Sequence, residues 1–437
     1  MAIKEIEISN FKSLHNNKME IGNFNILIGA NASGKSNFIQ FFKFLRDLAE
    51  FGLDDAVSMQ GGTEYLFNVN HRSEDTIFGR LIDDSRYILP MYKPAGIRAQ
   101  IIRSCYQFEL HLSRGKTYIV SVDDVIEHEC RFFPHQEGSS ARPLESVLQG
   151  SAKVFIEHHG GESVIRVEYD KNVNVEQVEE DIFDFWYIKN QREGKAPSPR
   201  IGRKQTLIES DILPFMMSRN RIKASMQEIS VYDIDPKIIK KAQPITGRHD
   251  LDPEGGNLAV VIRRLQKNAN KKRQIENIIN DLLPFVEGIS IKKLAENLII
   301  RMKERFKGEH LFPAFLLSDG TINLTALVIA LFFEKRGLKI IEEPERNMHP
   351  HLMSKVVGMM RDASSESQII TTTHNPEIVR HATLDELVLV SRDRNGDSVL
   401  SKPGERAEIR SFLKHEMGME ELYIQNILET YVGSGNE

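Results

Sequence analysis

The chain has 437 residues, of which 41% are hydrophobic and 27% are charged, as in an ordinary globular protein. The formal net charge of -5 does not favour a nucleic-acid-binding or membrane-binding protein as a class. The two cysteines, Cys105 and Cys130, form no CxxC pair, which argues against a disulfide scaffold or a structural zinc site and fits a reducing cytosol. The longest apolar run, residues 324–333, is too short to cross a bilayer. We therefore expect a soluble, cytoplasmic protein without a membrane partner.

The first 170 residues predict strands and one long helix. "KEIEIS" (residues 4–9) and "FNILIG" (24–29) have strand patterns, and residues 36–50 place apolar side chains at helical spacing. From about residue 75 to residue 170 the pattern is short and alternating, which predicts a β-rich region of antiparallel strands. The last two of these strands are expected to form a hairpin around Gly160 and Gly161.

The rest of the chain changes character twice. A stretch at 189–223 contains nine Lys/Arg against three Asp/Glu, although the chain is acidic overall. Helical spacing returns at 256–268 and 271–283, and the apolar run at 324–333 predicts a buried helix. Strands and helices then alternate, which predicts a parallel sheet with helices on its faces. No internal repeat is evident, and no segment sustains heptads long enough for an extended coiled coil.

The sequence "GANASGKS" (residues 29–36) matches the phosphate-loop pattern G-x-x-x-x-G-K-[ST], with an apolar strand before it and an amphipathic helix after it. Backbone N–H groups of such a loop cradle phosphates, Lys35 reaches the β- and γ-phosphates, and Ser36 is a ligand of Mg²⁺. A chance glycine-rich turn is the alternative, and the flanking elements disfavour it. We therefore predict an ATP and Mg²⁺ site whose nucleotide contacts are Asn31, Ser33, Gly34, Lys35, Ser36 and Asn37.

A second chemical motif is "IIEEPERNMHPH" (residues 340–351), where an apolar strand runs into two adjacent glutamates. A strand that ends in an acid brings a carboxylate to the Mg²⁺ of a phosphate-loop site, and a neighbouring acid can orient or deprotonate the attacking water. We assign Glu342 to the metal and Glu343 to the water. A cation would also relieve the repulsion between the two carboxylates. The alternative is a strand that simply ends in a solvated acidic loop.

Two further segments have both a structural and a functional interpretation. In "LLSDGTINL", Ser318 caps the N-terminus of a long apolar helix, and the same hydroxyl and N–H groups could face a phosphate. In "IITTTHNPEIV", His374 follows an apolar strand, at the end of an open α/β sheet where ligands bind. It is either a sensor of the γ-phosphate or a surface histidine without a role.

Taken in order, "NFKSL…ILIGANASGKSN", "LSDGT", "IIEEPERNMHP" and "TTTHNP" resemble the ABC-class ATPase heads of the SMC/RecF/OLD-like group. In particular, they resemble bacterial AAA-type predicted ATPases with an "EEPE…HP" Walker B motif, which are often found in phage-defence operons. The resemblance covers about the first 70 residues and roughly residues 225–430. It implies an α/β head with a mixed sheet and flanking helices. We expect an N-terminal part of the head at 1–125, an inserted β-rich and irregular lobe at 126–225, and a C-terminal part of the head at 226–437.

The resemblance assigns roles to several residues. It implies that Glu343 is the catalytic glutamate, aided by the switch histidine His374 and by Lys35. It also implies a signature motif that acts on ATP held by the other subunit, a D-loop, a basic position near the nucleotide and a Q-loop residue near the metal. These are, in turn, Ser318 with Gly320, Asn347, Lys12 and Gln60.

The resemblance also bears on partners. Because the phosphate loop and the signature lie on opposite sides of such a head, we expect a head-to-head homodimer around two ATP molecules, or a higher oligomer. Asp319 stands where transporters of this class carry glycine, and its carboxylate would repel a phosphate unless the side chain turns away. Residues 375–437 are too few for the nuclease domain that OLD proteins append, so a nuclease would be a separate chain.

Weaker candidates lie elsewhere. The basic stretch 189–223 could contact the backbone of DNA or RNA, although no aromatic residues alternate with its basic residues for base stacking. A solvated mobile loop is the alternative. Arg263, Lys267 and Lys271 would form a basic stripe if one helix ran through them. A zinc site at His349 and His351 is a further candidate.

We therefore predict an enzyme, an ATPase that converts ATP and water into ADP and phosphate, with slow turnover as one option. Its predicted role is that of a sensor or regulatory subunit of a bacterial anti-phage defence system, which controls a separately encoded nuclease or toxin. The alternative is a RecF/SMC-like DNA-binding ATPase that acts in DNA repair or recombination.

Overall fold

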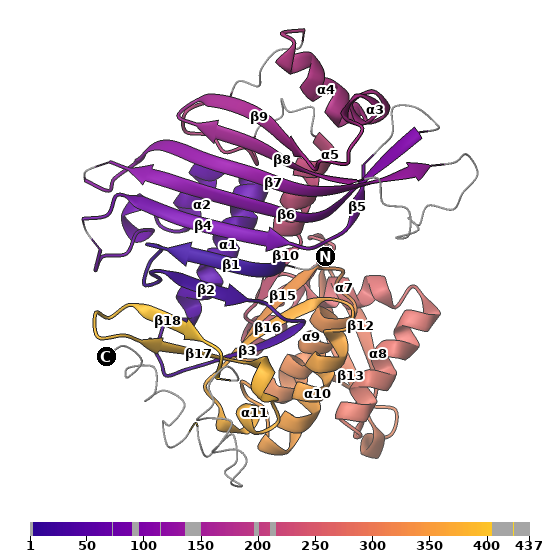
Figure 1. Ribbon diagram of the computed structural model, residues 1–437. Helices are drawn as coiled ribbons and strands as arrows, with labels where there is room; N and C mark the ends of the chain where they lie inside the picture. Colours follow the sequence, from indigo (N-terminus) through magenta and orange to yellow (C-terminus); the bar gives the residue numbers. More distant parts are fainter. Residues whose placement is uncertain are drawn as a thin grey trace. The chain divides into compact units, whose positions relative to one another are not determined.

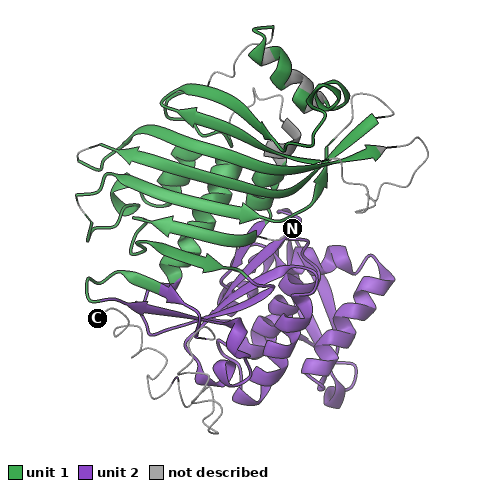
Figure 2. Cartoon of the chain, in the orientation of Figure 1, with its two compact units in different colours: residues 1–21, 36–228, 394–399 green, residues 22–35, 229–393, 400–437 purple. Residues whose placement is uncertain are grey.

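The computed structural model describes residues 3–71, 73–89, 96–113, 115–135, 150–195, 201–209 and 216–403, together with Tyr423. The chain divides into two compact units, which Figure 2 colours separately. The first unit comprises residues 1–21, 36–228 and 394–399, and the second comprises residues 22–35, 229–393 and 400–437. Lys35 is thus assigned to the second unit and Ser36 to the first. The three-part division made from the sequence stays a prediction.

The first unit is built on an antiparallel sheet in the order β2-β1-β4-β6-β7-β8-β9, with β5 paired to β6 (Figure 1). Buried side chains mostly alternate with less buried ones along β6, as expected for a sheet with one covered face. The predicted hairpin is confirmed, since His159 lies opposite Glu162 across the turn at Gly160 and Gly161. The bounds are β1 Ile3–Ser9, β2 Asn17–Glu20, β4 Thr76–Asp83, β5 Tyr87–Ile88, β6 Gly96–Leu112, β7 Ile119–His135, β8 Gly150–His159 and β9 Glu162–Tyr169.

Helix α1 supplies aromatic side chains to the core of the first unit. Phe41 and Phe44 pack against Phe108 of β6, with ring centroids 6.4 and 6.1 Å apart, and both also contact Phe11. The helix predicted at 36–50 is therefore confirmed and positioned by its apolar face. The bounds are α1 Lys35–Phe51, α2 Leu53–Met59, α3 Val175–Asp181, α4 Phe183–Arg192 and α5 Met216–Gln227, with a 3₁₀ turn at Thr63–Tyr65.

The second unit contains a parallel sheet in the order β10-β15-β16-β3-β17, with β18 next along this path. Its central strands are buried throughout, as parallel strands covered on both faces should be. A small antiparallel sheet has the order β11-β13-β12, with β14 paired to β13. The bounds are β3 Phe24–Ile28, β10 Ile229–Tyr232, β11 Gln243–Pro244, β12 Val286–Leu294, β13 Asn297–Glu304, β14 Leu311–Pro313, β15 Leu338–Glu342, β16 Gln368–Thr373, β17 Leu387–Arg392 and β18 Ser398–Ser401.

Helix α9 is the buried helix of the second unit, because every residue from Thr321 to Leu331 is buried. The helix expected from the apolar run at 324–333 is therefore confirmed. The bounds are α6 Pro236–Ile239, α7 Leu258–Leu265, α8 Ala269–Leu282, α9 Asp319–Phe332, α10 Met353–Ala363 and α11 Pro376–Arg380, with 3₁₀ turns at Arg305–Lys307, Ala314–Leu316, Pro350–Leu352 and Leu384–Glu386.

The predicted fold class is confirmed. An α/β unit with a parallel sheet is accompanied by a β-rich region, and none of the described segments forms a long coiled coil. Strands β6 and β7 are longer than the short alternating pattern predicted. Across the described ranges, the search for a helix both long and apolar enough to cross a membrane finds none.

The basic stretch 189–223 is not one solvated loop. Helices α4 and α5 occupy its two ends. Between them, the backbone N–H of Leu207 donates to the Asp124 carboxylate of β7 at 2.6 Å, and the side chain of Leu207 is fully buried. The interpretation as a solvated loop is therefore wrong for residues 206–208, which are buried, whereas residues 202–205 are exposed. Residues 196–200 and 210–215 lie outside the described residues.

Candidate functional site

The loop between β3 and α1 has the backbone geometry of a phosphate cradle. A Cβ on Gly29 would lie 2.1 Å from the carbonyl oxygen of Val390, so only glycine fits there. Gly34 has a φ of 114°, which favours glycine. Ala32 also adopts a left-handed φ of 63°, which explains why glycine would suit this position better. The guanidinium of Arg392 donates to the carbonyl oxygen of Ala32 at 3.0 Å and supports the strained residue.

Lys35 begins α1 and turns its side chain back over this loop. Its ammonium group donates to the carbonyl oxygens of Gly29 and Ala30 at 2.6 and 2.9 Å. The positive charge therefore lies beside the N-terminus of a long helix, whose dipole also attracts anions. Loop, lysine and helix terminus together form an anion-binding arrangement.

The two glutamates and the predicted switch histidine lie at the same edge of the parallel sheet as this loop. Figure 1 shows β15, β16 and β3 side by side. Glu342 ends β15 opposite Thr372 of β16, and Thr373 ends β16 opposite Ile28 of β3. Because parallel strands end at a common edge, residues 29–35, Glu342 and the residues after Thr373 gather there.

Glu343 is held in an uncommon backbone conformation with a φ of 43°. Its N–H donates to the carbonyl oxygen of Thr372 at 3.1 Å, which fixes the turn out of β15. One carboxylate oxygen lies 3.1 Å from His374 Nδ1, and the other lies 3.2 Å from the guanidinium of Arg346. The structure therefore brings together the predicted catalytic pair. It adds Arg346, which also donates to Asp233 at 2.8 Å.

The predicted D-loop segment, which follows Glu343, is anchored by a buried carboxyl group. Burial raises the pKa of Glu345, and the hydroxyl of Thr373 donates to its carboxyl group. Asn347, two residues later, adopts a left-handed φ of 64° and is exposed. Glu345 is thus a structural anchor, and it leaves Glu343 as the accessible carboxylate of this loop.

The predicted signature motif lies at the N-terminus of α9. The hydroxyl of Ser318 accepts the N–H of Thr321 at 3.1 Å, so Ser318 caps the helix. A Cβ on Gly320 would lie 2.5 Å from the carbonyl oxygen of Asn347. The first turn of α9 therefore packs directly on the D-loop segment, and glycine is required for this close approach.

The negative charge of Asp319, in the first turn of α9, is paired with a lysine. The carboxylate forms an ion pair with Lys240, which directly follows α6. Capping is provided by Ser318 instead. Lys240 was not predicted from the sequence, because a lone lysine 79 positions away carries no local signal. The pairing removes much of the repulsion that an anion near the α9 terminus would otherwise meet.

Four predicted residues belong to the first unit. Ser36 and Asn37 follow Lys35 on α1, and the Asn37 amide donates to the hydroxyl of Ser13 at 2.6 Å. Lys12 has a φ of 51°, and burial together with neighbouring Lys43 lowers its pKa. Gln60 follows α2 and is buried, and its side-chain oxygen has no hydrogen-bond partner among the described residues.

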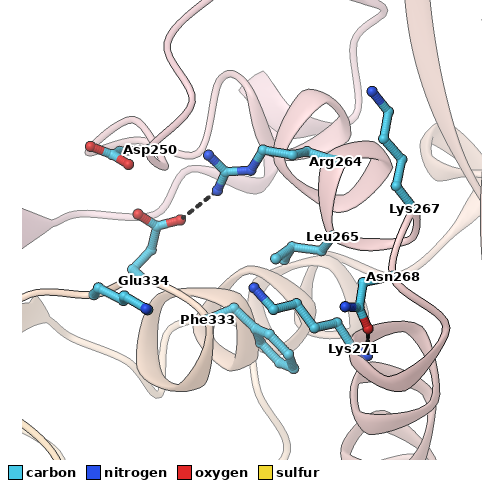
Figure 3. A pocket seen from close by; sticks show the side chains of 9 residues that line it. Asp250, Arg264, Leu265, Lys267, Asn268, Lys271, Phe333 and Glu334 are labelled. Atoms are coloured by element: carbon cyan, nitrogen blue, oxygen red, sulfur yellow. Dashed lines mark hydrogen bonds and ion pairs between the residues drawn. The ribbon is translucent and has the colours of Figure 1, made fainter.

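A cavity of about 430 Å³ lies among α7, α8 and the end of α9. In Figure 3, Glu334 and Arg264 face each other across it, 3.9 Å apart, and the side chains of Lys267 and Lys271 are also drawn. It lies near the start of β15, away from the strand end that carries Glu342. The predicted stripe does not form, because α7 ends before Asn268 begins a separate helix. Lys267 and Lys271 nevertheless share this cavity.

Comparison with known protein families gives two matches. The model described as "AAA domain, putative AbiEii toxin, Type IV TA system" matches residues 123–380, and the model described as "AAA ATPase domain" matches residues 1–129. A curated relative, the Septu protein PtuA of Bacillus thuringiensis, is 27% identical over 97 residues. This match covers 22% of the chain and 22% of PtuA, so the chain spans about a fifth of the length of that relative.

Among solved structures, an SMC head bound to the C-winged helix domain of ScpA is 16% identical, with a TM-score of 0.48 over 92% of this chain and 98% of that chain. The SMC head domain from Thermotoga maritima is 12% identical, with a TM-score of 0.39 over 92% and 99% of the two chains. The Smc head domain structure from Pyrococcus furiosus, with bound ScpA, is 14% identical, with a TM-score of 0.43 over 94% and 99%.

Proposed function

Because the chain belongs to the AAA domain family whose model matches residues 123–380, we propose that it binds and hydrolyses Mg·ATP at the common edge of β3, β15 and β16. One observation carries this proposal. Glu343 and His374 lie 3.1 Å apart at the edge where the phosphate loop also begins. A carboxylate with a cationic or hydrogen-bonding partner beside an anion cradle is the arrangement that water attack on a phosphate needs.

The residues present fit Mg·ATP. The cradle has no room for a side chain at Gly29, and the ammonium of Lys35 is directed onto the loop. The hydroxyl of Ser36 and the carboxylate of Glu342 are hard oxygen donors of the kind that Mg²⁺ prefers. When bound, Mg²⁺ neutralises phosphate charge and favours departure of the γ-phosphoryl group. Asn31, Ser33, Gly34 and Asn37 complete the proposed nucleotide contacts, with Lys12 and Gln60 from the first unit.

In the proposed mechanism, Glu343 orients the attacking water and accepts its proton. Both oxygens of this carboxylate already have partners, one in His374 and one in Arg346. One of these contacts therefore has to open before Glu343 can receive a proton. Arg346 has Asp233 as a second partner at 2.8 Å, so it is the contact that can be released at low cost. His374 then stays to hold the glutamate and to meet the γ-phosphate.

We further propose that two heads close around two ATP molecules, with Ser318 and Gly320 of one chain acting on ATP held by the other. The contact between Gly320 and the Asn347 carbonyl supports this arrangement, because it joins the signature to the loop that follows the catalytic glutamate. Through this contact, hydrolysis of the ATP beside Glu343 of one chain would shift the signature residues of the same chain, which contact the second ATP molecule. Dimer closure is then a population shift driven by ATP.

The biological role that we propose is regulation of a separately encoded effector, a nuclease or toxin, in a bacterial anti-phage defence system. The local match to a Septu protein supports this context. A DNA-binding ATPase of repair or recombination is the competing role. Stimulation of turnover by DNA or RNA, lost when the basic residues of 189–223 are neutralised, would favour that role. Co-purification of the chain with the products of neighbouring genes would favour the first.

The central test is nucleotide binding by Lys35→Ala, with Lys293→Ala as the matched control. Lys293 is exposed on β12, outside the proposed site. We expect Lys35→Ala to lose binding of a fluorescent ATP analogue, because the loop loses the ammonium group that reaches Gly29 and Ala30, whereas Lys293→Ala binds like the wild type. Unchanged binding by Lys35→Ala would remove the assignment of the phosphate loop.

A second test examines ATP-dependent dimerisation independently of nucleotide binding. With ATP, Glu343→Gln should accumulate as a dimer in light-scattering measurements, because nucleotide binding persists while turnover stops. Glu366→Gln, at an exposed position after α10, should behave like the wild type. If the wild type and Glu343→Gln both stay monomeric with ATP, the head-to-head arrangement is wrong.

A further inference from the structure

Three segments that are far apart in the sequence meet within the first unit. The loop before β2 forms isolated bridges from Phe11 to Phe67 and from Leu14 to Ser398. Each segment contributes one charged or titratable residue to a single cluster: His15, His71 and Asp397. Glu74 lies one turn after His71 and completes the group. None of these residues belongs to the ATP site proposed above.

Asp397, which lies behind His71, is buried and held by hydrogen bonds. The side chain of Asp397 is only 4% exposed. One of its oxygens accepts the amides of Asn68 and Asn70 at 2.8 and 3.0 Å, and the other lies 2.6 Å from Nε2 of His71. A carboxylate that is fixed in this way holds the Nε2 proton of the imidazole. In the neutral imidazole, the lone pair of His71 is then on Nδ1, where a metal ion could bind.

The Nδ1 atoms of both rings lie near the carboxylate of Glu74, and Nε2 of His15 lies 2.9 Å from the Asn16 amide. Nδ1 of His71 lies 3.6 Å from one oxygen of Glu74, and Nδ1 of His15 lies 3.8 Å from the other. The two rings stack with centroids 3.6 Å apart and planes 9° from parallel. Two imidazoles and a carboxylate thus lie within reach of one another, an arrangement that a bound cation would stabilise.

We propose that His15, His71 and Glu74 form a binding site for a divalent transition metal of the Zn²⁺ type. Their ligand atoms lie within 4.8 Å of one another. Two imidazoles and one carboxylate suit Zn²⁺ better than Mg²⁺, which prefers oxygen ligands alone. Asp397 acts as the positioning residue of His71, as carboxylates behind zinc-bound histidines commonly do.

Metal binding requires a small rearrangement, and the exposed members of the cluster allow it. Zn–N bonds are about 2.0–2.1 Å, so the three ligand atoms have to approach one another. Parallel rings cannot both direct a lone pair at one ion, so one ring has to turn out of the stack. The side chains of His15 and Glu74 are 18% and 43% exposed and can move, while Asp397 fixes His71.

Occupation of the site would fix the segment that leads to α1. Ser13, two residues before His15, accepts the Asn37 amide at 2.6 Å and contacts the hydroxyl of Ser398 at 2.7 Å. A metal ion held by His15 and His71 would therefore tie residues 10–17 to the segment around Asp397. The role is structural, and it is independent of ATP hydrolysis.

The test is an isothermal calorimetric titration of the full-length, chelator-treated protein with Zn²⁺. It is carried out without nucleotide and in excess Mg²⁺. Co²⁺ is titrated in parallel, because its visible absorption reports imidazole ligands. We expect one equivalent per chain in the wild type and none at this affinity in His15→Ala or His71→Ala. Asp397→Asn should weaken binding about 10- to 100-fold.

Two matched variants keep the result interpretable. His349→Ala/His351→Ala removes another pair of neighbouring histidines, whose ring centroids are 4.6 Å apart, and should leave the affinity unchanged. Glu74→Gln removes an exposed ligand and should lose the Zn²⁺-induced rise in melting temperature without lowering the melting temperature of the metal-free protein. The proposal is overturned if the wild type binds no Zn²⁺, if His71→Ala and Glu74→Gln bind it as the wild type does, or if only the His349/His351 variant loses it.

Discussion

Two carboxylates with histidine partners show how differently the two units use charge. Asp124, in the antiparallel sheet of the first unit, lies 3.0 Å from Nδ1 of His158, and neither side chain is exposed. Glu343, at the edge of the parallel sheet in the second unit, lies 3.1 Å from Nδ1 of His374, and the two side chains are 30% and 53% exposed. The distances are the same within a tenth of an ångström, but the surroundings are opposite.

The difference separates a structural pair from the pair that we propose to be functional. Asp124 also accepts the phenol of Tyr106 and the N–H of Leu207, so its carboxylate has no capacity left for a ligand. Burial raises the pKa of Asp124, which shows that a shifted pKa here reflects enclosure and not catalysis. Glu343 instead has partners that face solvent and can be exchanged. Exchangeable partners, more than a shifted pKa, support the proposed site at Glu343.

The largest effect on stability is expected for Asp124→Ala. It would leave His158 and the Leu207 N–H buried without a partner, which should cost about 3–5 kcal/mol in the free energy of unfolding. Asp123→Ala is the control, because Asp123 is the half-exposed neighbour on β7. Urea denaturation measures both. A loss below about 1 kcal/mol for Asp124→Ala would mean that the buried pair is not structural.

Glu343→Gln should show the reverse pattern. We expect ATP turnover to fall about 10²- to 10⁴-fold, because the water loses its proton acceptor. The free energy of unfolding should change by no more than about 0.5 kcal/mol, as for most exposed positions. Phosphate release and urea denaturation on the same preparation check both values. Wild-type turnover would contradict the assignment of Glu343, and a large loss of stability would make it a structural residue like Asp124.

Gly320→Ala tests the contact between α9 and the D-loop segment. The added Cβ would meet the Asn347 carbonyl at 2.5 Å, so the helix or the loop has to shift, at a cost of about 1–3 kcal/mol. Gly358→Ala, within α10, is the matched control, because a Cβ there meets nothing within 4 Å. It should stabilise the protein by up to about 1 kcal/mol, since alanine is the better helix former. Thermal unfolding should therefore shift in opposite directions for the two variants.

The enclosed chemistry of the first unit also predicts a dependence on pH. Burial lowers the pKa of His128 on β7 from 6.5 to about 3. Between these two pKa values, His128 is protonated in the unfolded chain and neutral in the folded chain. The stabilising contribution of neutral His128 is complete above about pH 6.5 and decreases as the pH falls toward 3, with a slope of about 1.4 kcal/mol per pH unit. Urea denaturation at pH 7, 6 and 5 should show a shallower loss for His128→Gln than for the wild type. Parallel profiles would contradict the prediction.

The sequence predicts elements whose signal is local. The strand and helix that flank residues 29–34, the hairpin at Gly160 and the buried α9 each depend on neighbouring residues, and these elements form as expected. Residues 206–208 were misjudged, because the apolar pair Leu207 and Ile208 is hidden in a strongly basic context. A composition signal averaged over the stretch cannot show that two side chains are buried in it.

Contacts between distant residues were beyond sequence reasoning. Arg346 is one basic residue in an acidic motif, and its bond to Asp233 spans 113 positions. The ion pair of Asp319 with Lys240 and the cluster around His71 have the same character. The first partner of each pair is visible in the sequence, but the second is selected only by the folded chain. The Ala32 position could have been anticipated, since a left-handed conformation is common in this loop type.

The placement of β3 has a consequence for biosynthesis. This strand lies between β16 and β17, and the Asn25 amide reaches the backbone oxygen of Ile369 across 344 positions. The second half of its hydrogen-bonding partners therefore emerges from the ribosome only after residue 387 has been translated. Until β16 has been translated, β3 has no neighbouring strand to pair with, and such long-range pairing is slow. The proposed nucleotide site should thus form late in synthesis, and chains that end before β16 should not bind ATP.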